Sequence, residues 1–216
     1  MKGTFISFNR RLDKLSLIVD DVLANRSTMS NNDRYALTEF IVSETWQAWN
    51  AFCKDVIIKS VQGCTARDGA VIPVRANSKN DYWRICYEAS CQAKSQKVKA
   101  NGHLSFKFYN AHTWGDANKM ILVVNGISPS NAPRLLNGFG AMTHVKDIQS
   151  VRNACAHKCN EVIASLKAEL MTKYNIRTVV HPADYAWTNT LIGNDIAYFL
   201  WVKEMKNTAL YITESN

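Results

Sequence analysis

The chain has 216 residues, of which 47% are hydrophobic and 20% charged, and this composition excludes an intrinsically disordered protein. Its most apolar stretches, residues 120–124 and 196–202, are far shorter than the roughly 20 residues that a membrane-spanning helix needs, so we expect no membrane partner. Lys and Arg number 26 against 18 Asp and Glu, and the net charge of +8 favours a polyanionic partner. The excess is concentrated in residues 67–119, which contain nine basic and four acidic side chains.

The N-terminus and the cysteines both indicate a cytoplasmic protein. Charged residues such as Lys2, Arg10 and Arg11 stand where a signal peptide needs an apolar stretch. The six cysteines need no disulfides, because a chain of this length can bury a hydrophobic core without them. We therefore expect reduced thiols.

Apolar residues at three- and four-residue spacing predict a series of helices along the chain. The expected ranges are 8–25, 33–61, 114–124, 143–174 and 184–206. We expect Asn31 or Asn32 to cap the second of these helices and Gly63 to end it.

The segment between the second and third main helices has a different pattern. Asp68-Gly69 indicates a turn, residues 71–74 form a short β-like run, residues 82–90 fit either helix or strand, and residues 102–109 alternate as a strand does. We therefore predict an all-α fold in a single domain, residues 1–216, with a basic insertion of mixed structure over residues 62–112.

The stretch from 151 to 160 combines residue types that suit phosphodiester chemistry. Asn153 and His157 are four residues apart on a predicted helix, so we expect the amide to orient the imidazole through a hydrogen bond. Arg152 offers a planar cation for phosphoryl oxygens, and His157 can transfer a proton near neutral pH. In RNA the adjacent 2′-hydroxyl can act as the nucleophile, so we expect no metal and no cofactor.

This Arg-Asn-x-x-x-His motif on a late helix resembles the Arg-x4-6-His signature of the HEPN superfamily (higher eukaryotes and prokaryotes nucleotide-binding). Residues 44–52, Glu-Thr-Trp-Gln-Ala-Trp-Asn-Ala-Phe, are also similar to the first core helix of many members. The resemblance covers residues 33–61 and 114–206, which would form the core of a HEPN-like helical bundle. One departure is Cys159, because members paired with a nucleotidyltransferase antitoxin carry Tyr at that position.

The resemblance implies a metal-independent endoribonuclease of a toxin–antitoxin, abortive-infection or other defence system, including CRISPR-associated antiviral defence. It implies a homodimer in which two motifs face each other across a cleft, with a possible antitoxin or defence-system partner protein. Arg152 and His157 would be catalytic and Asn153 would orient them. Two alternatives from other classes stay open: a non-catalytic RNA- or nucleotide-binding module, and a helical adaptor protein that binds another subunit.

Further residues are candidates for the same site or for a metal. Lys158 lies beside the motif, and Lys94, Lys97 and Lys99 stand near aromatic residues in the insertion, so these four are candidate RNA-binding residues. Glu44 is a candidate for orienting Arg152 from the neighbouring helix. Two metal sites are conceivable, one at Cys155, His157 and Cys159 and one at Cys86, Cys91, His103 and His112, but buried thiols and spacings unlike those of known zinc motifs favour neither.

Overall fold

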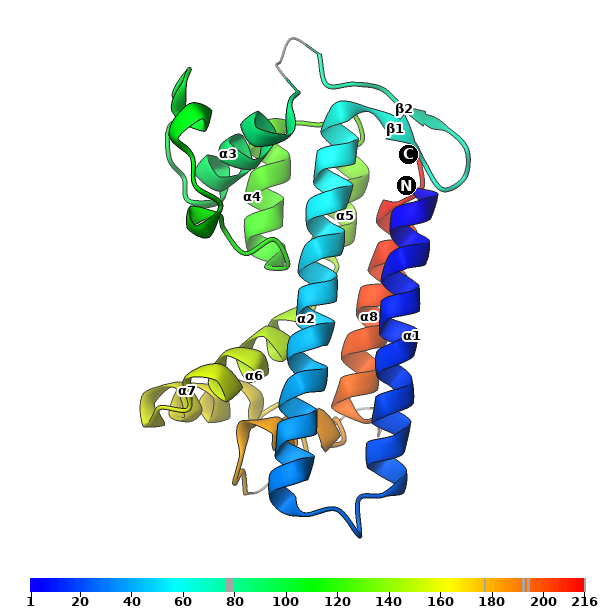
Figure 1. Cartoon of the computed structure of the whole chain (residues 1–216), viewed down its shortest axis with the longest axis vertical. Helices are drawn as coiled ribbons and strands as arrows, with labels where there is room; N and C mark the ends of the chain where they lie inside the picture. Colours follow the sequence, from blue (N-terminus) through cyan, green and yellow to red (C-terminus); the bar gives the residue numbers. More distant parts are fainter. Residues whose placement is uncertain (77–79, 177, 192, 194, 216) are drawn as a thin grey trace. The chain divides into compact units, whose positions relative to one another are not determined.

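A computed structural model of the chain describes residues 1–76, 80–176, 178–191, 193 and 195–215. The described residues are mostly helical, in agreement with the predicted all-α class (Figure 1). The α-helices are α1 (Lys2–Ala24), α2 (Asn31–Gln62), α3 (Tyr82–Ala93), α4 (Ala117–Ile127), α5 (Ala132–Gly140), α6 (Val145–His157), α7 (Asn160–Leu170) and α8 (Ala197–Ile212). Within these residues, no helix has both the length and the apolar character that crossing a bilayer requires.

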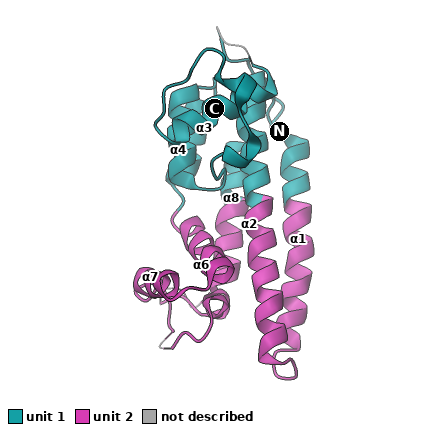
Figure 2. Cartoon of the chain, turned by 60° about the vertical axis from the view of Figure 1, so that its left-hand side comes forward, with its two compact units in different colours: residues 1–8, 49–142, 207–216 teal, residues 9–48, 143–206 magenta. Residues whose placement is uncertain are grey.

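The chain divides into two compact units (Figure 2). Unit 1 comprises Met1–Phe8, Trp49–Met142 and Asn207–Asn216, and unit 2 comprises Asn9–Ala48 and Thr143–Lys206. The expected insertion lies in unit 1, where α3 packs against α4. The HEPN-like arrangement of a single domain stays a prediction.

Local capping interactions explain where several helices begin and end. The Ser30 hydroxyl accepts a hydrogen bond from the Asp33 N–H at 3.2 Å and so caps α2, which corrects the expected caps at Asn31 and Asn32. As predicted, α2 ends just before Gly63, whose φ of 79° is in the left-handed region that glycine tolerates. The Asp81 carboxylate accepts from the Arg84 N–H at 3.0 Å at the start of α3.

The segment after α2 has mixed structure, although one predicted strand in it is wrong. The strands β1 (Cys64–Thr65) and β2 (Val71–Ile72) pair antiparallel around the predicted turn, with Cys64 opposite Ile72. Residues 102–109, predicted as a strand, contain two short 3₁₀ helices instead, η1 (Gly102–Ser105) and η2 (Phe108–Asn110). Their alternating aromatic residues line a pocket described below, so the alternation does not mark the face of a sheet.

The predicted helix over residues 143–174 is two helices, because the chain turns after His157. Lys158 adopts a left-handed conformation with φ of 40°, and α7 begins two residues later. A left-handed conformation of a residue other than glycine costs on the order of 1 kcal/mol or more. The Lys158 ammonium lies 2.7 Å from the Glu39 carboxylate of α2, and this long-range ion pair supports the turn.

The last predicted helix, residues 184–206, also differs from the structure. A 3₁₀ helix, η3 (Pro182–Trp187), comes first, and α8 begins only at Ala197. Gly193, with φ of 97°, lies in the connection, and residues 192 and 194 are outside the described residues. His181 caps η3 through its ring, which accepts from the Ala183 N–H, while Asp184 accepts from the His181 N–H.

The core of unit 1 is built around an aromatic cluster at the start of the chain and in α2. The ring centroids of Phe8 and Phe52 are 4.6 Å apart, and that of Trp49 lies within 6 Å of both. The Trp49 indole donates to the Gly115 carbonyl at 3.1 Å, and the Gly115 N–H donates to the Asn50 side chain at 2.8 Å. These two bonds fix the chain just before α4.

The core of unit 2 contains a fully buried carboxylate, Asp147 of α6. It accepts hydrogen bonds from the Tyr174 hydroxyl at 2.6 Å and from the Lys173 ammonium at 2.7 Å. The Tyr174 hydroxyl accepts from the Trp201 indole of α8 at 2.8 Å. A second carboxylate of α8, Glu204, accepts from the first backbone N–H groups of α6, where the helix dipole favours negative charge.

We expect Asp147→Ala to lower the free energy of unfolding by about 1–3 kcal/mol, because it leaves the buried Tyr174 hydroxyl without its acceptor and removes the partner of the partly exposed Lys173 ammonium. Urea denaturation followed by circular dichroism measures this change. Asp13→Ala is the control, since Asp13 pairs with Lys206 at 2.7 Å on the surface and should cost under about 1 kcal/mol. Equal losses in the two variants would contradict the role given to the buried carboxylate.

Candidate functional site

The Arg-Asn-x-x-x-His motif lies at the C-terminal end of α6, and the expected Asn–His hydrogen bond is not formed. Arg152 and Asn153 are half-buried, and the Asn153 side-chain oxygen accepts from Arg152 at 3.3 Å. His157 is the last residue of α6 and is exposed. Among the described residues its ring has no hydrogen-bond partner, so Asn153 positions Arg152 and leaves the imidazole open to solvent.

The acidic residue that approaches this end of α6 is Glu39 rather than Glu44. Glu44 binds Arg11 of α1 at 2.8 Å and Gln47 at 3.2 Å, so the structure does not bring it to Arg152. Glu39 accepts from Lys158 at 2.7 Å, and this contact raises the pKa of the Lys158 ammonium. Lys158, a candidate RNA-binding residue, is therefore paired, although about half of its side chain remains exposed.

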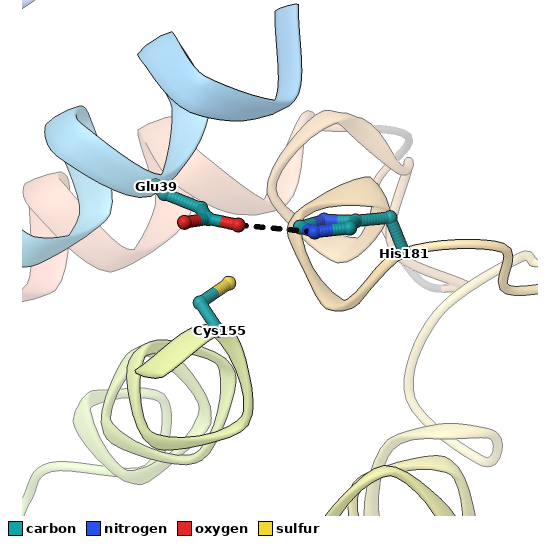
Figure 3. Close-up of side chains that lie close together, drawn as sticks. All are labelled: Glu39, Cys155 and His181. Atoms are coloured by element: carbon teal, nitrogen blue, oxygen red, sulfur yellow. Dashed lines mark ion pairs between the residues drawn. The ribbon is translucent and has the colours of Figure 1, made fainter. Parts of the chain in front are cut away.

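Glu39 also belongs to a cluster with Cys155 and His181 that the sequence does not reveal. One ligand-type atom of each residue lies within 4.8 Å of the other two. The His181 Nε2 lies 3.0 Å from a Glu39 carboxylate oxygen, and the Cys155 sulfur points toward both groups (Figure 3). Glu39 lies on α2, Cys155 lies on α6, and His181 directly precedes η3. The His181 ring also stacks on the Tyr35 ring, with 4.2 Å between the ring centroids.

The electrostatics of this cluster do not suit a cysteine nucleophile. Burial, followed by the charge of Glu39, raises the pKa of the Cys155 thiol to about 12, whereas a reactive cysteine needs a lowered value. Burial also lowers the pKa of His181, although Glu39 opposes this. Cys155 is therefore a protonated thiol near neutral pH. The conceivable metal group of Cys155, His157 and Cys159, which the sequence did not favour, does not form a cluster among the described residues, where Glu39 and His181 accompany Cys155 instead.

Unit 1 contains an open pocket of about 660 Å³ with aromatic walls, which we call the aromatic pocket. A volume of this size is typical of sites that hold small organic groups. Half of Trp83 and 85% of Tyr109 are exposed to solvent. The residues that line the pocket come from the start of α3 and from the segment with the two 3₁₀ helices: Asp81, Trp83, His103, Leu104, Phe106, Lys107, Phe108 and Tyr109.

Ring packing around Phe108 builds one wall of the aromatic pocket. Its centroid lies 4.4 Å from that of Trp83, 5.7 Å from that of Tyr82 and 5.9 Å from that of Phe106. Lys54 of α2 places its ammonium about 5 Å from the rings of Tyr82 and Phe108, close enough for cation–π attraction. Contacts within unit 1 thus hold this wall in place, while the rings of Trp83 and Tyr109 remain exposed to solvent.

The predicted RNA-binding lysines of the insertion lie on the chain that leads into the aromatic pocket. Residues 94–107 contain four lysines and no acidic residue. Lys97 and Lys99 are exposed and, among the described residues, form no ion pair, whereas Lys94 donates to the Asn110 carbonyl. The backbone N–H of Lys99 donates to the Tyr87 hydroxyl at 3.0 Å, which ties this lysine-rich segment to α3.

The possible zinc ligands of the insertion do not come together in the described part of the chain. Cys86 and Cys91 are buried in α3, and His103 contacts Arg84 at 3.4 Å. His112 is 6% exposed, its ring centroid lies 4.3 Å from that of Trp114, and neither of its ring nitrogens has a hydrogen-bond partner among the described residues. Burial, followed by the charges of Lys119 and Lys94, lowers the pKa of His112 to about 4.

Comparison with known proteins finds no matching family model, no matching curated protein and no matching solved structure. Sequence reasoning missed Glu39, His181 and Trp83 as candidate functional residues. The Pro after His181 indicated only a break between helices. Trp83 does not continue the helical spacing of apolar residues in α3, because it lies in the first turn of that helix and most of the buried residues of α3 lie on another face. The aromatic residues at 106, 108 and 109 were a sequence signal for base stacking beside the lysines, but not for a pocket.

We expect His112 to make the protein less stable as the pH falls from about 6.5 to about 4. Above pH 6.5 His112 is neutral in both the folded and the unfolded protein. Between pH 6.5 and about 4 it is protonated in the unfolded chain but stays neutral in the folded one, so the unfolded chain is stabilised. The loss in free energy of unfolding reaches roughly 3 kcal/mol at pH 4. Urea denaturation at several pH values measures it, and His112→Phe should remove this part of the pH dependence; an unchanged dependence in that variant would refute the assignment.

Proposed function

We propose that the protein binds single-stranded RNA with the aromatic pocket of unit 1 and is an endoribonuclease that uses Arg152 and His157. The observation that carries the binding proposal is the combination of solvent-open rings with a lysine-rich approach. Trp83 and Tyr109 offer faces on which bases can stack, and Lys97, Lys99 and Lys107 offer charges to the phosphates.

The affinity of such a site comes from two sources that can be measured separately. Stacking contributes about 1–3 kcal/mol for each base on an aromatic ring and tolerates any base sequence. Neutralised phosphates contribute a term that weakens with salt, with a slope of about −0.7 for each phosphate of a single strand. The net charge of +8 supports this second term.

We expect Trp83→Ala and Tyr109→Ala each to weaken binding of a fluorescent single-stranded RNA by about five- to 150-fold, which corresponds to the loss of one stacked base. Fluorescence anisotropy at low salt measures the dissociation constant. Phe40→Ala is the control, because Phe40 is 48% exposed on the part of α2 that lies in unit 2. Lys99→Gln removes one proposed phosphate contact. It should therefore reduce, by about 0.7, the slope with which the logarithm of the binding constant falls against the logarithm of the salt concentration. Absence of RNA binding at low salt would instead favour the adaptor alternative.

The observation that favours cleavage is the exposure of His157 and the fixed position of Arg152 at the end of α6. His157 is exposed and without a hydrogen-bond partner in the described chain, and Arg152 is steadied by Asn153. In the proposed reaction the 2′-hydroxyl oxygen attacks the adjacent phosphorus and the bond to the 5′-oxygen breaks. His157 moves the proton at the attacking or the leaving oxygen, and Arg152 stabilises the charged phosphorane. The products are a 2′,3′-cyclic phosphate and a 5′-hydroxyl.

The proposed enzyme acts as a homodimer in which two copies of the α6 end meet at one ribose-phosphate linkage. This arrangement follows from the resemblance to the HEPN superfamily, as do a role in defence and control by an antitoxin. A non-catalytic RNA-binding module is the alternative, and it would use the same aromatic pocket.

We expect His157→Ala to reduce RNA cleavage by about 10²–10⁴-fold, since the general acid–base group is lost. Mixed tRNA and mRNA are incubated with the protein in EDTA, and the 2′,3′-cyclic phosphate ends are measured. Cys159→Ser, a change at another exposed residue close by, should cleave like the wild type. Undiminished cleavage by His157→Ala would remove the catalytic assignment and leave the binding proposal untouched.

A further inference from the structure

Three potential metal ligands of different chemistry converge in unit 2 without any signal in the local sequence. The ligand atoms of Glu39, Cys155 and His181 lie within 4.8 Å of one another and come from three separate elements (Figure 3). Cys155 is buried, whereas Glu39 and His181 are half-buried. A metal ion that enters from the solvent side, past Glu39 and His181, could therefore reach all three groups.

The spacing of the three atoms is close to what a tetrahedral ion requires. With bonds of about 2.0–2.3 Å to nitrogen, oxygen and sulfur, two ligands of a tetrahedral zinc ion are about 3.3–3.8 Å apart. The Glu39 oxygen and the His181 Nε2 are already 3.0 Å apart, so they need only separate slightly, while the sulfur moves in by up to about 1 Å. We propose that Glu39, Cys155 and His181 form a zinc-binding site with three protein ligands and an open fourth position.

The donor set selects the kind of metal. A thiolate and an imidazole prefer zinc and related transition-metal ions, whereas magnesium and calcium prefer a set made of oxygen atoms. A cysteine, a histidine and a carboxylate on three elements are also the ligand types that zinc accepts in sites that keep a position open for water.

Lys158 already pairs with one of the three proposed ligands, Glu39. Its ammonium lies 2.7 Å from the Glu39 oxygen, so it competes with a cation for the same carboxylate. About half of the Lys158 side chain is exposed, and the chain at this residue is the left-handed turn between α6 and α7. The ammonium can therefore swing into solvent and keep its proton when the metal enters.

Metal binding requires a defined movement of protons. The Cys155 S–H bond is replaced by a sulfur–zinc bond, and the thiol proton is released to solvent. The His181 ring proton moves from Nε2 to Nδ1, which gives up the 3.2 Å hydrogen bond that Nδ1 accepts from the Ala183 N–H. Three interactions are lost, namely the hydrogen bond from Ala183 to His181, the contact between His181 Nε2 and Glu39, and the ion pair between Lys158 and Glu39, and three metal–ligand bonds are formed. No oxidant or reductant takes part.

Zinc at this site would join α2, α6 and the residue that caps η3. His157 is two residues after Cys155 on α6, so the metal would also fix the end of the helix that carries the proposed catalytic residues. None of its ligands is a proposed RNA-binding or catalytic residue, so metal binding can be tested separately from the proposed function.

The test uses the full chain, freed of metal with a chelator and then titrated with Co²⁺ as a spectroscopic probe. We expect one Co²⁺ for each chain, a thiolate-to-cobalt charge-transfer absorption, and loss of this absorption when Zn²⁺ replaces the probe. Cys155→Ser should abolish the absorption, Glu39→Gln should weaken binding tenfold or more, and Cys159→Ser should behave like the wild type. Lys158→Gln should tighten binding, because it removes the competing ammonium. Mg²⁺ should not displace Co²⁺.

Circular dichroism of each variant shows that it is folded before it is titrated. The proposal is overturned if the wild type gives no thiolate absorption, if the absorption survives in Cys155→Ser, or if Cys159→Ser abolishes it. It is also overturned if Glu39→Gln binds as tightly as the wild type. RNA cleavage in EDTA is measured separately, so failure of the zinc site and failure of the ribonuclease are distinguishable.

Discussion

The buried carboxylate of Asp147 requires donors from several elements of unit 2 at once. Tyr174 and Lys173 supply them from the segment after α7, and the Trp201 indole of α8 completes the chain of hydrogen bonds. A charge buried without these partners would cost several kcal/mol, so α6 can adopt its place only when the other two segments are in theirs. Because α6 carries Arg152, Cys155 and His157, the geometry of both candidate sites in this unit depends on that constraint.

The two units offer different chemistry. Unit 1 has aromatic rings that pack against one another on one side and are exposed to solvent on the other. Beside them lie exposed lysines, Lys97 and Lys99, that form no ion pair among the described residues, and this arrangement suits binding of a flexible polyanion. Unit 2 has the exposed imidazole of His157 at the end of α6, and Cys155, two residues earlier on the same helix, comes together with Glu39 and His181. The arrangement in unit 1 supports the binding step of the proposed function, and the exposed imidazole of His157 supports the cleavage step. Glu39, Cys155 and His181 form the proposed zinc site.

The sequence predicted the parts of the fold that depend on local information. The long α2 and its end at Gly63 follow from uninterrupted helical spacing and from the conformational freedom of glycine. The turn at Lys158 could not be predicted in the same way, because Lys158 forms its supporting ion pair with Glu39 on a distant helix. The poor helix formers Asn153 and His157 lie close before that turn, but they were interpreted only as functional residues. The motif residues were found because they are adjacent in sequence, whereas Glu39 and His181 meet only in the folded chain.

The central claim is that bases of single-stranded RNA lie in the aromatic pocket of unit 1. Ultraviolet crosslinking of a bound RNA, followed by mass spectrometry of the digested protein, identifies the residues in contact with bases. The account predicts crosslinks at Trp83, Phe108 or Tyr109, the rings on which a base can stack. Crosslinks that lie only outside residues 81–109, from a protein that binds the RNA, would contradict it.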